Sequence, residues 1–146
     1  MKLYLMRHGE AASEQIDPQQ GLSAHGRAGI ENLATRLAGQ DIQFAQIFHS
    51  DKTRAKQTAE IMGRILAPGL MPEQRSGLKP NDDPHKLIAE IESWQQDTLI
   101  CSHLPFVPSL IVQLSGQPQG MGFVPGTIVC LEKENHVWKI NWMETP

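Results

Sequence analysis

The sequence predicts an α/β fold, a three-layer α/β/α sandwich around a mostly parallel central sheet, with a C-terminal antiparallel hairpin and no cap domain. Short apolar runs of strand length alternate with longer segments in which apolar residues recur at helical spacing. This alternation is typical of βαβ units and of a sheet covered by helices on both faces. The last apolar segment instead divides into two strands around a polar turn, which indicates a hairpin. A chain of 146 residues fits one domain, 1–146.

The first third of the chain contains a strand, a long loop, a helix and a second strand. Residues 2–6 are mostly apolar and run into an Arg-His-Gly triplet, which predicts a buried strand. Residues 10–22 are polar and predict a loop, and Ser23 is a suitable N-cap for the helix that follows. Apolar residues recur on one face of this helix until Gly39 ends it. Residues 44–50 predict the second strand.

The middle of the chain continues the same alternation. Apolar spacing predicts helices over 52–66 and 84–94, with a short strand over 70–75 between them. Residues 97–103 predict a strand and residues 104–116 a helix. Each strand is therefore followed by a helix that can pack on the sheet.

The C-terminal segment 126–143 predicts the hairpin, with its turn at Lys133–Asn135. Trp138 and Trp142 lie four residues apart, so a regular strand would place both on one side of the sheet. We expect the two rings to pack in the core.

Composition and charge exclude several classes of protein. The net charge of −3 gives no basic surface for nucleic acid. Cys101 and Cys130 each lie in an apolar run and are expected to be small buried hydrophobes rather than disulfide or metal ligands. The apolar stretch 3–6 is too short for a signal peptide, and no run approaches the ~18 residues of a membrane span. A cytoplasmic protein without membrane contact is expected.

Chemically active residues follow the predicted strands. Arg7 and His8 end the first strand, His103 ends the strand over 97–103, and Arg54 lies in the first turn of the helix after the second strand. Because the carboxyl ends of parallel strands meet at one edge, the two imidazoles and two guanidiniums are expected to converge there. Such a cluster is repulsive unless it holds an anion, and a phosphoryl group matches the paired donors of arginine.

A histidine in this cluster could act as a nucleophile. A neutral imidazole nitrogen attacks phosphorus, and a covalent intermediate divides the transfer into two steps. Positioned cations would stabilise the charge on the phosphoryl oxygens, and Pro105 places a helix amino end just after His103.

Three motifs in this order resemble the histidine phosphatase superfamily: "LMRHGE", "FHSDKTRAKQT" and "ICSHLPFV". The SixA-like branch of phosphohistidine phosphatases fits best, over Leu3 to about Trp142. The resemblance implies a phosphatase without a cofactor or a bound metal ion.

The resemblance also implies a role for each matching residue. His8 would be the nucleophile that becomes phosphorylated, and Arg7 and Arg54 would bind the phosphoryl group. His103 would donate to a phosphoryl oxygen, and the backbone N–H of Leu104 would complete the site.

A general acid is harder to assign. Larger family members carry a carboxylic acid on inserted segments, and the stretch between Arg54 and His103 is too short for a cap domain. Asp82, Asp83 and Glu10 are the nearest carboxylates, and none has the expected setting. This absence favours a leaving group that needs little protonation, such as the imidazole of phosphohistidine.

Three functions are left open by the sequence. The leading hypothesis is a phosphohistidine phosphatase that acts on a phosphorylated protein through phospho-His8. The alternatives are a small-molecule phosphomonoesterase of the same superfamily and a non-catalytic phosphate-recognition module. A metalloenzyme built on His8 and His103 is disfavoured because two histidines without a carboxylate make a poor ligand set. No residue specifies the partner protein or the oligomeric state.

Overall fold

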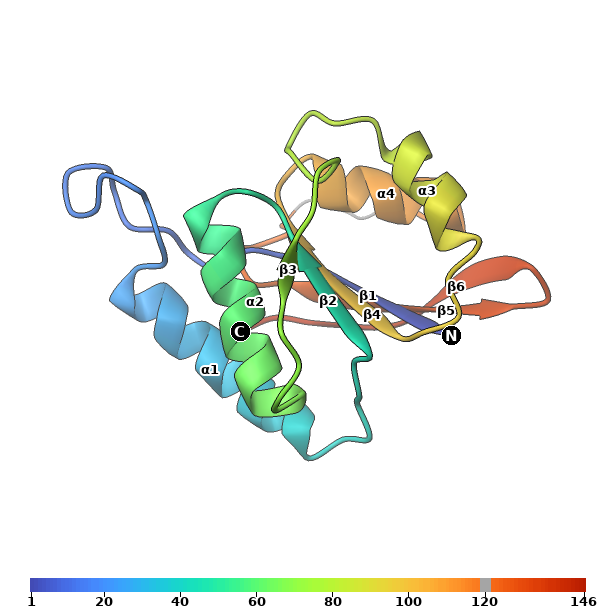
Figure 1. Ribbon diagram of the computed structural model, residues 1–146, viewed down its shortest axis with the longest axis horizontal. Coiled ribbons are helices and arrows are strands. Elements are labelled where there is room, and N and C mark those ends of the chain that lie inside the picture. Colours follow the sequence, from blue (N-terminus) through green and yellow to red (C-terminus); the bar gives the residue numbers. More distant parts are fainter. Residues whose placement is uncertain (119–121) are drawn as a thin grey trace.

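The structure is a computed structural model, and it describes residues 1–118 and 122–146. Its strands are β1 Lys2–Arg7, β2 Gln46–His49, β3 Glu73–Gln74, β4 Thr98–Ser102, β5 Ile128–Glu134 and β6 Val137–Glu144. Its helices are α1 Ala24–Ala38, α2 Thr53–Leu66, α3 Pro84–Ile91 and α4 Phe106–Ser115. The strands form one sheet in the order β3-β2-β4-β1-β5-β6, in which β5 and β6 are antiparallel to their neighbours and the other pairs are parallel (Figure 1).

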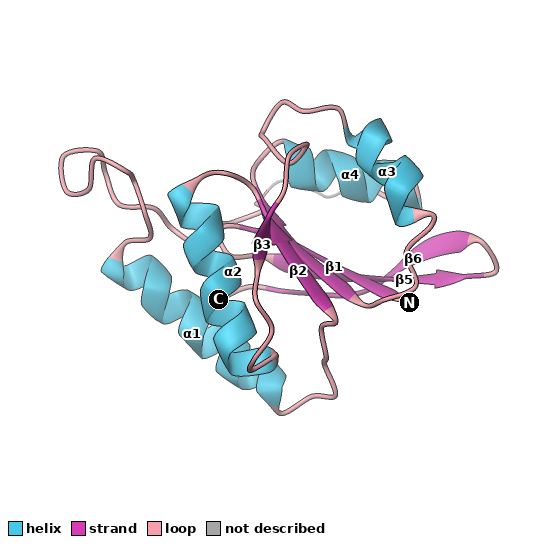
Figure 2. Cartoon of the chain, in the orientation of Figure 1, coloured by secondary structure: helices cyan, strands magenta, loops and turns pink. Residues whose placement is uncertain are grey.

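The helices cover the two faces of this sheet, with α1 and α2 on one face and α3 and α4 on the other (Figure 2). Side chains of β1 alternate between the two layers, as the period of a strand requires. Leu3 and Leu5 pack with α3 and α4, whereas Tyr4 and Met6 pack with α1 and α2. The predicted three-layer α/β/α fold with a C-terminal hairpin is therefore confirmed.

The parallel strands bring their carboxyl ends to one edge of the sheet. β4 lies between β1 and β2, with Arg7 paired to Ser102 and His49 paired to Cys101. The residues that follow these strands therefore start from neighbouring points. Between β2 and β4 the chain forms only α2, β3 and α3, so this stretch contains no cap domain.

The structure corrects three element boundaries. The strand expected over 70–75 is only Glu73–Gln74, and the helix expected to reach residue 94 ends at Ile91. The hairpin turn lies at Asn135–His136, one residue later than predicted. Both turn residues have positive φ, 52° and 66°, which suits the twist of a two-residue hairpin turn.

The prediction that both tryptophans face one side of the sheet is wrong. Leu131 pairs with Ile140, but Cys130 pairs with Trp142, so β6 contains one extra residue at this point. Such a bulge reverses the alternation of side chains. Trp138 therefore packs in the layer of α3 and α4, whereas Trp142 contacts Tyr4 on the opposite face. Core packing is confirmed for both rings.

The loop before α1 is held by the helix amino end. Ser23 accepts a hydrogen bond from the Gly26 N–H as the N-cap, and its own N–H donates to the Glu10 carbonyl at 2.9 Å. A Cβ added at Gly26 would overlap that Glu10 carbonyl oxygen, which is backbone and cannot move aside easily. The close approach of α1 to residue 10 therefore requires glycine at position 26.

We predict that Gly26→Ala destabilises the protein, although alanine is the better helix former. The overlap should lower the free energy of unfolding by about 1–3 kcal/mol, measured by urea denaturation. Gly39→Ala is the matched control, because its Cβ would lie an ordinary 3.6 Å from the Arg36 carbonyl oxygen. An unfolding free energy that rises in Gly26→Ala as much as in the control would contradict this packing argument.

Candidate active site

Three segments distant in sequence meet at the carboxyl edge of the sheet. The rings of His8 and His103 have centroids 5.1 Å apart and planes 58° apart. Arg54, in the first turn of α2, donates from Nε to the His8 Nε2 at 3.3 Å. The backbone N–H of His8 also donates to the backbone carbonyl of Ser102 at 2.9 Å. This hydrogen bond joins the segment with the first motif to the segment with the last motif. The structure thus brings His8, Arg54 and His103 together.

The backbone fixes the orientation and tautomer of His8. Its Nδ1 lies 2.7 Å from the Gly9 carbonyl oxygen, which can only accept, so Nδ1 carries the proton. Nε2 then holds a lone pair, consistent with its acceptance of the Arg54 Nε–H. Burial, assisted by the charges of Arg54 and Arg7, lowers the pKa of His8 to about 4. The ring is therefore neutral at pH 7, and its free nitrogen is nucleophilic.

Arg7 lies beside this ring at the end of β1. Its Nη1 donates to the Phe123 carbonyl at 2.7 Å, which anchors the guanidinium. Its Nε is buried and has no hydrogen-bond partner among the described residues. Burial lowers the pKa of Arg7, but a guanidinium remains charged in proteins. A charged, buried donor without a partner indicates a place for an anion.

His103 contributes a second buried nitrogen to the site. The side chain is 2% exposed, and its Nε2 lies 2.6 Å from the Ser50 Oγ. Its Nδ1 is buried without a partner in the part of the chain that the structure describes. Burial and the neighbouring His8 and Arg54 lower the pKa of His103 to about 4, so this ring is also neutral at pH 7.

Sequence reasoning assigned no role to Ser50, Gln57 or Thr58, although all three belong to the quoted motif "FHSDKTRAKQT". The Thr58 hydroxyl accepts from the Gly9 N–H at 3.0 Å and donates to the Arg54 carbonyl at 2.8 Å. Gln57 accepts from the Leu22 N–H through its side-chain oxygen. Gln57 and Thr58 join α2 to the loop after β1, and the polar side chains that follow Arg54 within one motif were the available signal for them.

Leu104 directly follows His103 and precedes α4, which begins at Phe106. Its side chain is 37% exposed. The role expected for its backbone N–H stays a prediction.

The three candidate acids have other partners. Glu10 accepts from the Ser23 hydroxyl at 2.9 Å. Asp82 accepts from the Lys79 N–H, and Asp83 caps α3 by accepting from the His85 N–H. The hydrogen bonds from His85 lower the pKa of Asp83, which keeps this carboxyl ionised. Each carboxylate thus has a local structural role, and the lowered pKa makes Asp83 a poor proton donor at neutral pH.

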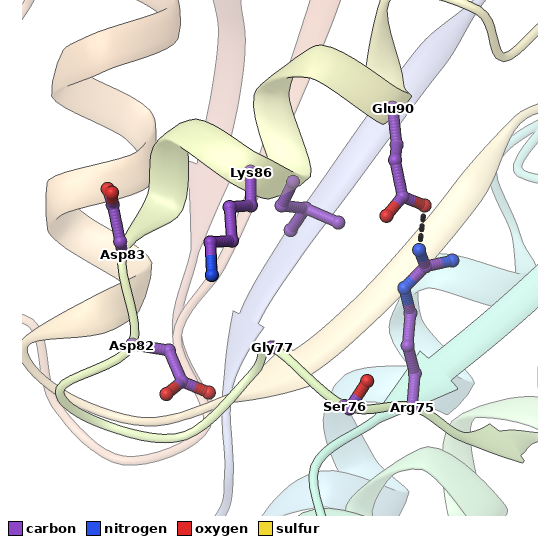
Figure 3. Close-up of a pocket in the computed structure, with 8 residues that line it drawn as sticks. Arg75, Ser76, Gly77, Asp82, Asp83, Lys86 and Glu90 are labelled. Atoms are coloured by element: carbon purple, nitrogen blue, oxygen red, sulfur yellow. Dashed lines mark ion pairs between the residues drawn. The ribbon is translucent and has the colours of Figure 1, made fainter.

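Asp82 and Asp83 also line a cavity of about 320 Å³ between α3 and the loop after β3 (Figure 3). Arg75, which forms an ion pair with Glu90, lies on the other side of this cavity. His8 and His103 are absent from its lining.

The described residues contain no group of three or more His, Cys, Asp and Glu side chains arranged to hold a metal ion. They likewise contain no helix long and apolar enough to cross a membrane.

Comparison with solved structures identifies the same fold. The chain superposes on the protein histidine phosphatase SixA complexed with tungstate with a TM-score of 0.87 and 26% identity, covering 100% of this chain and 97% of that one.

Comparison of sequences gives two informative relatives. The phosphohistidine phosphatase SixA of Escherichia coli (strain K12) is 27% identical over 152 residues, covering 100% of this chain and 94% of the relative. The mitochondrial serine/threonine-protein phosphatase Pgam5 of Caenorhabditis briggsae is 33% identical over 93 residues, covering 64% of this chain. The match spans only 32% of the nematode protein's own length.

Residues 3–80 match the family model described as histidine phosphatase superfamily (branch 1). This range covers the first two motifs and more than half of the chain. The chain belongs to branch 1 of the histidine phosphatase superfamily.

Proposed function

We propose that this protein is a phosphohistidine phosphatase, which removes the phosphoryl group from a phosphohistidine on another protein through a phospho-His8 intermediate. The observation that carries the proposal is the state of His8. Its Nδ1 proton is held by the Gly9 carbonyl, so Nε2 carries the lone pair, which can attack phosphorus once Arg54 releases it. Arg7 Nε is a buried donor and His103 Nδ1 a buried ring nitrogen, both without partners among the described residues, which suits phosphoryl oxygens beside the His8 Nε2.

The reaction has two displacements at phosphorus. In the first, the Nε2 of His8 forms a P–N bond while the P–N bond of the substrate breaks, and the substrate ring, which carries a proton on its other nitrogen, leaves with the electron pair as neutral imidazole. In the second, water attacks phosphorus, the bond to Nε2 breaks, and inorganic phosphate leaves while the water's proton passes to solvent. Arg54 must release Nε2 before the first step, and its guanidinium then stabilises the transferred group.

The positive charge that this mechanism requires comes from Arg7 and Arg54. Because two guanidiniums neutralise the phosphoryl oxygens, the chemistry proposed here is independent of a metal ion.

The three candidate acids, Glu10, Asp82 and Asp83, already accept other hydrogen bonds, and this supports phosphohistidine as the substrate. A serine or alkyl phosphate must expel an alkoxide and needs an acid, whereas an imidazole is a much better leaving group. Full-length similarity to a phosphohistidine phosphatase, 27% identical, supports the same choice.

Two exposed apolar residues follow residues of the site. Leu104, 37% exposed, follows His103, and Val124, 42% exposed, follows Phe123, whose carbonyl anchors Arg7. Exposed apolar side chains next to an uncapped site suit contact with a protein substrate.

A second candidate is a phosphatase for phosphoserine or phosphothreonine on proteins. The 33% identity with the nematode Pgam5 favours it, because that relative is named for this activity.

Substrate preference separates the two candidates. With EDTA present throughout, we expect a phosphohistidine peptide to be hydrolysed at least ~100-fold faster than a matched phosphoserine peptide, the lower size of a general-acid effect. Equal turnover or a preference for phosphoserine would reject phosphohistidine as the substrate class, and loss of turnover in EDTA would reject the metal-free mechanism.

The covalent intermediate can be trapped. Brief incubation with a ³²P-labelled phosphohistidine peptide, followed by alkaline denaturation, should leave label on the wild-type protein and none on His8→Ala. Conversion of His8 to alanine should lower kcat by at least ~10⁴-fold, because it removes the nucleophile. His25→Ala, which alters a histidine on α1, is the control expected to retain label. Label that persists in His8→Ala would contradict the assignment.

The ionisation of His8 gives a test that needs no substrate. In an NMR titration its ring should protonate with a midpoint near pH 4. An unfolded histidine titrates near 6.5, so the unfolded state binds protons first as the pH falls. The contribution of His8 to the free energy of unfolding should therefore decrease from about pH 6.5 down to about pH 4 and then level off, with His103 adding a decrease over the same range. His8→Ala should show a smaller decrease, and a midpoint near 6.5 in the wild type would contradict the neutral nucleophile.

A further inference from the structure

Ser50 connects the end of β2 to His103, a contact to which the proposed mechanism assigns no role. It directly follows β2 and is 1% exposed, and its N–H donates to the Cys101 carbonyl at 3.3 Å. Its hydroxyl oxygen lies 2.6 Å from the Nε2 of His103, which is 2% exposed. A short hydrogen bond between two buried groups is energetically expensive to break, since neither group can turn to water.

The hydrogen atoms around Ser50 determine the direction of this bond. The Ser50 oxygen accepts from the Lys52 N–H at 3.3 Å, at the start of α2. A hydroxyl has one hydrogen to donate, and the His103 Nε2 is the acceptor within reach. Donation from Ser50 requires a lone pair on Nε2, and a neutral ring then carries its proton on Nδ1.

The position of Nδ1 in the site explains why its protonation state matters for binding a phosphoryl group. Nδ1 is buried without a partner among the described residues, on a ring whose centroid is 5.1 Å from that of His8. As an N–H it can donate to a phosphoryl oxygen on His8. If Nδ1 instead carried a lone pair, it would repel the same oxygen. A ring protonated on both nitrogens is disfavoured by burial and by the nearby positive charges of Arg54 and Lys52, whereas Asp51 favours it.

We propose that Ser50 is a positioning residue: its hydroxyl donates to Nε2 of His103 and thereby holds that ring in the neutral tautomer with the proton on Nδ1. This proposal rests on the proposed phosphatase for its catalytic consequence, although the tautomer itself is a property of the resting protein. It explains how a histidine that remains neutral at pH 7 still presents a donor to the phosphoryl group. It also explains why a serine occupies a fully buried position at the start of the "SDKTR" segment.

The test reads the tautomer directly, by ¹⁵N NMR of histidine-labelled protein at pH 7, with the His103 signals assigned by their loss in His103→Gln. In the wild type we expect Nδ1 to be protonated and Nε2 to carry a lone pair. In Ser50→Ala we expect the Nε2–H form to become populated, and kcat on a phosphohistidine peptide to fall by up to roughly 100- to 1,000-fold, the effect of losing a donor in an oxyanion site.

Ser102→Ala is the matched control. It removes another buried serine hydroxyl at the same sheet edge, which donates to the Leu78 carbonyl and not to a ring. We expect the His103 tautomer to remain unchanged in this variant, whatever its effect on stability.

The outcomes separate the inference from the proposed function. Protonated Nε2 in the wild type, or an unchanged tautomer in folded Ser50→Ala, overturns the role of Ser50 even if activity falls. If Ser50→Ala does not fold, the wild-type spectrum alone decides. The predicted tautomers in a protein that hydrolyses no phosphohistidine peptide would support Ser50 as the positioning residue while rejecting the proposed function.

Discussion

The site depends on how a sheet edge accommodates four basic side chains in a small space. Two guanidiniums beside two imidazoles would repel one another strongly if all were charged. Burial resolves the conflict by lowering the pKa of both His8 and His103 to about 4, so that only the arginines are positive at pH 7. The remaining cost is two buried N–H donors without partners in the described structure, on Arg7 and His103. A tetrahedral anion satisfies both donors and the charge.

The fold supplies this arrangement through strand pairing rather than through local sequence. β1, β4 and β2 are parallel neighbours, so Arg7 and Ser102 stand side by side although 95 residues separate them. Thr58 then fixes the loop after β1 to the first turn of α2 by accepting from Gly9 and donating to Arg54. A substitution that shifts α2 would therefore be expected to misplace Arg54 before it disturbs the core.

The sequence predicted the layers and the meeting of His8, Arg54 and His103 because both follow from periodicity and from the topology of parallel sheets. It could not predict the faces of Trp138 and Trp142, because a bulge reverses side-chain alternation without any local compositional signal. The hydrogen bond between Ser50 and His103 was equally hidden, because its partners lie 53 residues apart and depend on ring orientation. The sequence left the general acid unassigned, and the local hydrogen-bonding roles of Glu10, Asp82 and Asp83 depend on how the loops are placed.

A crystal structure with tungstate, a tetrahedral oxyanion, would show whether this edge of the sheet binds a phosphoryl-like anion. We predict one well-ordered anion next to the His8 Nε2, accepting hydrogen bonds from Arg7 Nε and His103 Nδ1, with Arg54 turned from the His8 ring onto an anion oxygen. The nitrogens of Arg7 and His103 that have no partner among the described residues would then both be satisfied. An anion bound only elsewhere, or a site that stays free of anion at saturating tungstate, would show that His8, Arg7, Arg54 and His103 do not form a phosphoryl site.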